Sequence, residues 1–240
     1  MLYVICYHSA YGGRYRNSIT QIKFHLDYLA NHFSFVFPGE SIKKSVCLTF
    51  DDAYFDFYHL VFPLLKEMGA KAVLGVPSAF IQDKSRLSVS ARLSLLAPPD
   101  CSAIRKDAFC SWTELEEMQK SGFVYIASHG HTHQNLLSSN VDLTEEIIHS
   151  KQILQSKLSC PIDTFIYPMG KFSGAVHRQV RLQYKYAMRL GGALNYSWQN
   201  SSGLIYRLFG DDLKNHKGPV SKKYYPAQAM RLLFNMARSR

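Results

Sequence analysis

Residues 45–52 read SVCLTFDD, an apolar run that ends in two adjacent carboxylates. A short run of apolar and β-branched residues bounded by polar ones is typical of a buried strand. In alternating β/α folds, residues just past the carboxyl end of a strand line the active-site face. We therefore expect a strand over 45–50, with Asp51 and Asp52 at that face. The alternative is a pair of aspartates that caps the following helix.

Similar runs recur along the chain and alternate with amphipathic, helix-like stretches. We expect strands at 2–7, 45–50, 72–76, 124–128, 164–167, 184–188 and 204–208, and helices at 19–32, 57–68, 113–120 and 144–158. Gly69 follows the second helix as a C-cap. This order predicts a single-domain α/β fold built on a parallel sheet or barrel.

Two regions break this alternation. Residues 81–110 show mixed periodicity and a Pro-Pro pair, so we expect an insertion or lid after the strand at 72–76, with one short helix at most. Residues 214–240 hold seven Lys or Arg and no acid, and 227–237 are amphipathic. The division that follows is a domain at 1–213 and a basic C-terminal tail or helix.

Composition narrows the class of protein. Of the 240 residues, 47% are apolar and 19% charged, which is typical of a globular protein and excludes collagen and disulfide-stapled miniproteins. The net charge of +10 indicates an anionic partner: a nucleic acid, a phosphorylated substrate or a membrane surface. Because no motif that reads nucleic acid is present, we expect no nucleic acid partner.

We expect the chain to have neither an export signal nor a membrane-spanning segment. No apolar run approaches the roughly 20 residues that span a bilayer. Residues 1–6 are apolar but short and lack a basic segment before them, so we expect no signal peptide and a cytoplasmic location. The basic C-terminal residues predict peripheral contact with an anionic membrane, on its inner face; a merely solubilising tail is the alternative.

A second polar cluster follows the strand expected at 124–128. Residues 128–133 read SHGHTH, and imidazole is a common transition-metal ligand. His129 and His133 converge if the segment turns helically, and His131 then points elsewhere. The alternative is a histidine-rich loop without function.

Together the two clusters predict a catalytic metal site. One carboxylate and two imidazoles leave coordination positions open for water and substrate. A neighbouring carboxylate can take the proton of the water. The reaction class is metal-assisted hydrolysis of an amide or ester. His8, at the end of the first strand, opens on the same face and can protonate a leaving amine; an exposed strand-end histidine is the alternative.

The motifs TFDD at 49–52 and SHGHTHQNL at 128–136 resemble the first two motifs of the polysaccharide deacetylases, carbohydrate esterase family 4. Weaker agreement lies at 69–76, 111–115 and 165–170, so the likeness spans about residues 1–210 in order. Residues 7–9, Tyr-His-Ser, resemble the circularly permuted branch of the family. The resemblance implies a distorted (β/α)7 barrel and hydrolytic removal of N-acetyl groups from amino sugars.

The resemblance also implies roles by motif position. Asp51 would be the general base, and His8 the general acid. Asp52, His129 and His133 would bind a divalent metal, with zinc as the default. The backbone N–H of Met169 would stabilise the oxyanion.

One motif departs from the family pattern. The third motif usually reads Arg-x-Pro-Tyr, and its arginine orients the base, whereas residues 166–169 here read Ile-Tyr-Pro-Met. Arg207 is a candidate replacement. We expect Tyr167, Pro168, Trp198 and Arg207 near the substrate, although Trp198 fits a core position equally well.

Our expectation that the chain has no signal peptide also bears on the substrate class. We expect an amino sugar in a cell-surface glycan, in lipopolysaccharide, or in a lipid-linked or nucleotide-linked precursor. One alternative is a deformylase that acts on a lipid-linked sugar. Because the motif arginine is missing, a catalytically weak or inactive carbohydrate-binding homologue is another.

Overall fold

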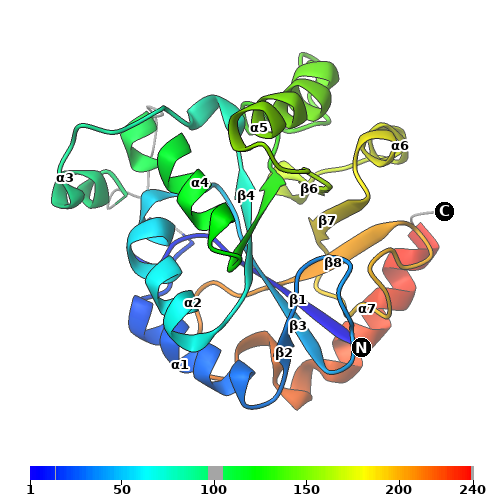
Figure 1. Ribbon diagram of the computed structural model, residues 1–240. Helices are drawn as coiled ribbons and strands as arrows, with labels where there is room; N and C mark the ends of the chain where they lie inside the picture. Colours follow the sequence, from blue (N-terminus) through cyan, green and yellow to red (C-terminus); the bar gives the residue numbers. More distant parts are fainter. Residues whose placement is uncertain (14, 97–104, 239–240) are drawn as a thin grey trace.

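The computed structural model describes residues 1–13, 15–96 and 105–238. Seven parallel strands form its centre (Figure 1). They are β1 (Leu2–Tyr7), β3 (Ser45–Phe50), β4 (Ala72–Val76), β5 (Val124–Ser128), β6 (Thr164–Ile166), β7 (Tyr186–Leu190) and β8 (Leu204–Phe209). Their order is β1-β8-β7-β6-β5-β4-β3, and pairing of β1 with β3 closes the ring. The expected distorted (β/α)7 barrel is confirmed.

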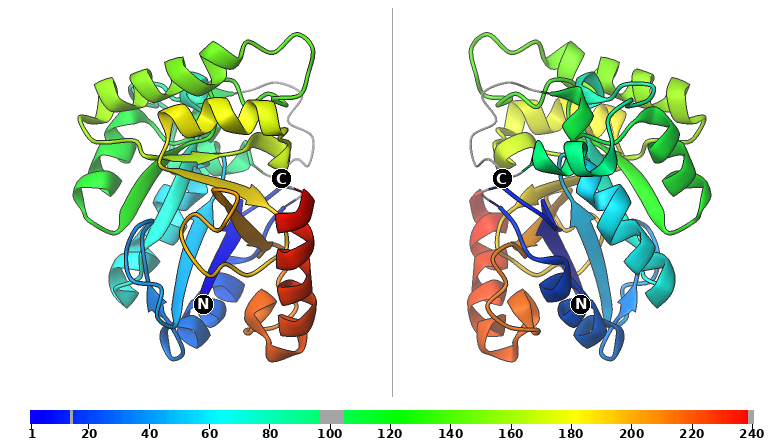
Figure 2. Two further views of the ribbon diagram at one scale, coloured as in Figure 1. Left: turned by 90° about the vertical axis from the view of Figure 1, so that its right-hand side faces the viewer. Right: turned by 90° about the vertical axis from the view of Figure 1, so that its left-hand side faces the viewer.

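Helices surround the barrel (Figure 2). They are α1 (Ile19–Ala30), η1 (Phe57–Val61) with α2 (Phe62–Met68), α4 (Trp112–Lys120), η4 (Thr144–His149) with α5 (Ser150–Leu158), and α6 (Gly174–Gln183). The η1–α2 segment ends at Gly69, whose φ of 61° is the left-handed conformation expected of a C-cap. Ser111 caps α4 with a reciprocal bond to Glu114.

Shorter elements occupy the two regions that break the alternation. Residues 81–110 contain the short helix α3 (Val89–Ser94) and the turn η3 (Lys106–Ala108); residues 97–104 of this region lie outside the described residues. Near the C-terminus, helix α7 (Tyr225–Arg238) runs along the outside of the barrel (Figure 2). The Asn235 side chain of α7 donates a hydrogen bond to the carbonyl of Gly191.

Two elements were not expected from the sequence. Strand β2 (Ser34–Phe35) pairs with the first residues of β3, on the edge where β4 pairs with the last ones. Two residues are too few to show a period. Helix α6 buries only Val176 and Val180, so its apolar signal is weak.

The barrel has its own interior core, separate from the layer between strands and helices. It is built by alternate residues of the strands, among them Val4, Cys47, Val73, Ala127, Ile166, Met188 and Ile205. Because side chains alternate along a strand, each inward series continues toward the carboxyl end of its strand. That continuation decides which polar side chains reach the site.

Candidate metal centre and catalytic cavity

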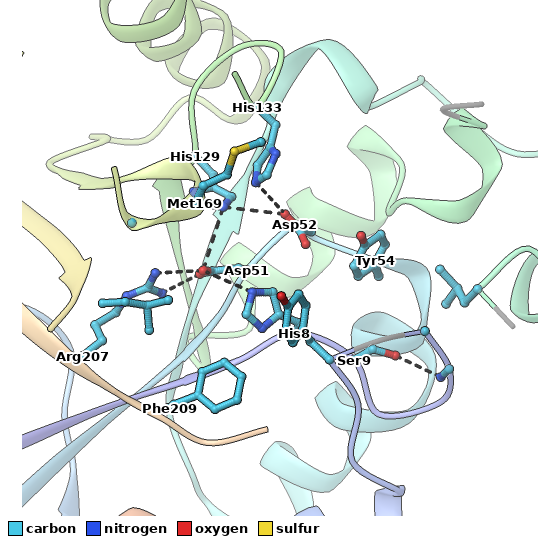
Figure 3. Close-up of a pocket in the computed structure, with 16 residues that line it drawn as sticks. His8, Ser9, Asp51, Asp52, Tyr54, His129, His133, Met169, Arg207 and Phe209 are labelled. Carbon is cyan, nitrogen blue, oxygen red and sulfur yellow. Dashed lines mark hydrogen bonds and ion pairs between the residues drawn. The ribbon is translucent and has the colours of Figure 1, made fainter. Parts of the chain in front are cut away.

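Four inward series end in polar side chains at the carboxyl end of the barrel. Counting in steps of two from Val4, Cys47, Ala127 and Ile205 arrives at His8, Asp51, His129 and Arg207. All four line one cavity of about 480 Å³, together with Asp52 and His133 (Figure 3). The inward alternation along these strands, together with their parallel pairing in the barrel, brings these four residues to one site.

Asp52, His129 and His133 form a candidate metal-binding triad. Asp52 Oδ1 lies 3.3 Å from His133 Nε2 and 3.6 Å from His129 Nε2. Asp52 reaches the same cavity as Asp51 because the backbone turns there, with φ of 71° at Asp52 and 53° at Ala53. Two imidazoles and a carboxylate that face an open cavity fit a catalytic divalent transition metal.

The ring of His129 has the orientation and the protonation state that a metal ligand needs. Its Nδ1 lies 2.9 Å from the carbonyl oxygen of Ile166, which fixes the ring and directs Nε2 into the triad. Burial lowers the pKa of His129 to about 4, although the carboxylates of Asp51 and Asp52 oppose the shift. The ring is therefore neutral at pH 7, the state that binds metal.

The histidine loop is not the helical turn expected from the sequence. His129 and His133 converge through left-handed backbone at Gly130, φ 79°, and at His133, φ 56°. The buried carboxylate of Glu146 holds the loop from behind by accepting the N–H groups of His131 and Thr132. A Cβ at Gly130 would clash with Glu146 Oε2, and the left-handed backbone there also favours glycine.

Asp51 is paired with Arg207. The guanidinium donates two hydrogen bonds, from Nη1 to Oδ1 at 2.6 Å and from Nη2 to Oδ2 at 2.8 Å. Burial alone would raise the pKa of Asp51, but the charge of Arg207, helped by His129, holds it well below its usual range. Arg207 thus lies where a cation is needed to orient and ionise Asp51, although it comes from β8 rather than from the third motif.

His8 is paired with Asp211, which the sequence reasoning missed. His8 Nδ1 lies 2.6 Å from Asp211 Oδ2, and the backbone N–H of His8 donates to Oδ1. His8 Nε2 faces Asp51 Oδ2 at 3.8 Å. Burial lowers the pKa of His8, but the hydrogen bond that its ring donates to Asp211 and the charges of Asp51 and Asp52 outweigh burial and raise the pKa to about 9. The available signal was Asp211 itself, an acid just past the end of β8.

The segment after β6 contributes Met169 to the cavity. Met169 has a left-handed backbone, φ 55°, and its side chain is 58% exposed. Tyr167 and Pro168, expected near the substrate, are buried and do not line the cavity. The Tyr167 hydroxyl instead lies 2.8 Å from Nδ1 of His177. Tyr167 and His177 therefore support the segment after β6 on the side away from the cavity.

Trp198 does not form a wall of this cavity. It belongs to the interior core of the barrel and packs edge-on against Tyr186, the first residue of β7. Its indole N–H donates to the carbonyl of Glu40, in the turn before β3. These partners place Trp198 at the amino end of the strands, so the core interpretation is the correct one.

Aromatic side chains form part of the cavity lining. Tyr15, Tyr54 and Phe209 line it beside Leu96, from the region between α3 and η3. The Tyr15 ring lies 5.2 Å from the ring of His8 and 5.9 Å from that of Phe209. These flat rings form an aromatic wall of the cavity beside the polar pairs.

We compared the sequence with protein-family models and with curated proteins. A family model described as polysaccharide deacetylase matches residues 39–188. No curated protein matches the sequence.

Several solved structures share the fold. BC0361, a polysaccharide deacetylase from Bacillus cereus, is 17% identical with a TM-score of 0.72 over 90% of this chain and 66% of its own. IcaB from Ammonifex degensii is 20% identical, TM-score 0.69, over 94% of each chain. Streptococcus pyogenes deacetylase PplD, solved with acetate, is 21% identical, TM-score 0.67, over 87% of this chain and 91% of its own. This chain therefore spans about two thirds of the Bacillus protein and nearly all of the other two.

Proposed function

Because the chain belongs to the polysaccharide deacetylase family, we propose that its cavity catalyses metal-dependent hydrolysis of an N-acetyl group on an amino sugar. The observation that supports this most is a convergence within one cavity. The triad of Asp52, His129 and His133 lies beside the Asp51–Arg207 pair and the His8–Asp211 pair. Each pair can perform one proton transfer of an amide hydrolysis.

The roles of the protein groups follow from their charges. The triad would hold the ion, for which we propose zinc. When bound, such an ion polarises an amide oxygen and lowers the pKa of water. Asp51, kept ionised and oriented by Arg207, takes a proton from the attacking water. His8, protonated at neutral pH, gives a proton to the departing sugar nitrogen.

The backbone N–H of Met169 is our proposed donor to the developing oxyanion. The Asp51–Arg207 pair also favours an active enzyme over a protein that only binds carbohydrate. A buried ion pair beside a metal-binding triad has no evident use in carbohydrate binding alone.

The test is mass spectrometry of an N-acetylglucosamine oligomer incubated with the zinc-loaded protein. We expect stepwise loss of acetyl groups and release of acetate. An N-formyl sugar tested in parallel identifies a deformylase by preferential release of formate. Intact substrates in both reactions would leave the carbohydrate-binding homologue as the better description.

The pH dependence provides a separate test of His8. Since His8 acts in its protonated form, kcat/KM should fall as the pH rises through its pKa of about 9. Asp211→Asn removes a charge and a hydrogen-bond acceptor that favour the protonated ring. We expect the alkaline limb of the pH profile to move about 1–2 units toward acid. An alkaline limb that does not move would contradict the assignment of His8 as the acid.

We also propose that the substrate is a lipid-linked or other membrane-associated amino sugar, reached from an anionic membrane surface such as the cytoplasmic leaflet. On α7, Met230, Leu233 and Phe234 are 59–68% exposed and lie at i, i+3 and i+4, on one side of the helix. Exposed Lys222 and Lys223 lie in the short turn η7 (Lys222–Tyr224), which precedes the helix. Apolar exposure beside lysines is the pattern of an interfacial helix. Within the described residues, no helix is long and apolar enough to cross a bilayer.

Vesicle co-sedimentation tests this contact. Introducing Met230→Glu and Leu233→Glu together should weaken binding to phosphatidylglycerol vesicles about tenfold or more, because two apolar contacts are lost and two negative charges gained. Leu182→Glu, which alters the 82% exposed leucine of α6, is the matched control and should bind like the wild type. Equal binding by all three proteins would exclude α7 as the membrane contact.

A further inference from the structure

The central histidine of the loop, His131, faces away from the triad. Its Nδ1 lies 2.9 Å from the hydroxyl of Ser78, and its ring meets that of His149 edge-on at 5.2 Å. Glu145 lies one turn before His149 on the η4–α5 segment, with its Oε2 at 3.8 Å from His149 Nε2. One ligand atom from each of His131, Glu145 and His149 can be chosen so that all lie within 4.8 Å of one another.

We propose that His131, Glu145 and His149 form a second binding site for a divalent transition-metal ion of the zinc class, on the outer side of the histidine loop. The donor set is again two imidazoles and one carboxylate, which suits zinc, copper and nickel. We name these three residues the outer site and the Asp52 triad the inner site. No step of the proposed reaction uses the outer site.

The protein already holds His131 in position. The Ser78 hydroxyl occupies Nδ1 and leaves Nε2 as the ligand atom. The backbone is fixed on both sides, because the N–H of His131 donates to Glu146 and its carbonyl accepts from Ala79 at 2.9 Å. Binding therefore requires little further ordering of this ligand, which lowers the entropic penalty.

The other two ligands can adjust to an ion. Ligand atoms at about 2.1 Å from zinc lie at most about 4.2 Å apart. The Glu145 side chain is exposed and His149 is half-buried, so rotation of these two side chains can bring the ligand atoms within that distance. Contact with solvent also supplies water for the remaining coordination positions. An ion here would join the histidine loop to the helix segment, directly behind the inner ligands His129 and His133.

Equilibrium dialysis of the full chain against zinc separates the two sites. We expect the wild type to bind two equivalents, His149→Ala one, Asp52→Ala one, and the double variant none. If His149→Ala binds as much zinc as the wild type, the outer site is refuted. If Asp52→Ala binds as much as the wild type while His149→Ala loses one equivalent, the inner site fails and the outer site stands.

Three further variants make the test specific. Glu145→Gln keeps the shape of the side chain but removes its charge, and should lower the affinity of the outer site for zinc. Ser78→Ala removes no ligand, yet should weaken zinc binding at the outer site about tenfold, because the His131 ring loses the hydrogen bond that orients it. His59→Ala removes an exposed histidine that stacks on Phe55 and belongs to no candidate metal group within the described residues. The His59→Ala control should bind zinc like the wild type. Unchanged zinc affinity of the outer site in both Glu145→Gln and Ser78→Ala would contradict the proposal.

Discussion

Asp51→Asn is expected to lower kcat by about 10²–10⁴-fold while the inner site still binds metal. Asparagine keeps the shape of the side chain but cannot accept the proton of the attacking water. The three proposed ligands, Asp52, His129 and His133, are unchanged. Turnover of the oligomer and metal content of the dialysed protein, measured on the same sample, provide the test.

Controls distinguish the base from the ligands. Asp52→Ala should lose both the inner metal and activity, because it removes a ligand from the triad. Since asparagine leaves the charge of Arg207 without its partner, thermal unfolding must confirm that Asp51→Asn is folded at the assay temperature. Turnover near the wild-type value would show that Asp51 is not the base.

Arg207→Met is expected to lower the free energy of unfolding by about 3–5 kcal/mol, because it leaves the buried carboxylate of Asp51 without its partner. Arg207 is 1% exposed and also donates to the hydroxyl of Thr49 at 3.1 Å. Losing the guanidinium should raise the pKa of Asp51, since burial is then less opposed. The acid limb of the activity profile should move to higher pH.

A double variant shows whether the effect comes from the pair. Combining Arg207→Met with Asp51→Asn removes both charges, so urea unfolding should recover most of the lost stability. Arg207→Lys keeps a positive charge but loses the bidentate hydrogen bond to Asp51. Its free energy of unfolding should lie between those of the wild type and Arg207→Met. If the double variant is as unstable as Arg207→Met alone, the ion pair is not what stabilises this part of the barrel.

The strands were predictable because each carries a buried, apolar run. The expected strands at 2–7, 45–50, 72–76 and 124–128 agree with the structure at both ends. The expected bounds of β6, β7 and β8 differ from the structure by one or two residues. Strand β7 begins later than expected because Tyr184 is the C-cap of α6. Closure between β1 and β3 is a long-range pairing that local periodicity does not encode, and it was expected only from the family resemblance.

The site was predictable where motif and strand pattern coincide. The triad residues follow predicted strands, so their convergence could be anticipated. The His8–Asp211 pair was not anticipated, because the two residues lie 203 positions apart and meet only through the long-range pairing of β8 with β1. The place of Trp198 stayed open between the substrate side and the core for a related reason: an aromatic residue in a loop gives no indication of which end of the barrel it covers.

The most direct measurement is acetate released from an N-acetylglucosamine oligomer by one preparation, first stripped with a chelator and then reloaded with zinc. We expect no release by the stripped protein, restored release after reloading, and none from Asp52→Ala in either state. Equal release by stripped and reloaded protein, or release by Asp52→Ala, would contradict the metal-dependent deacetylase that we propose.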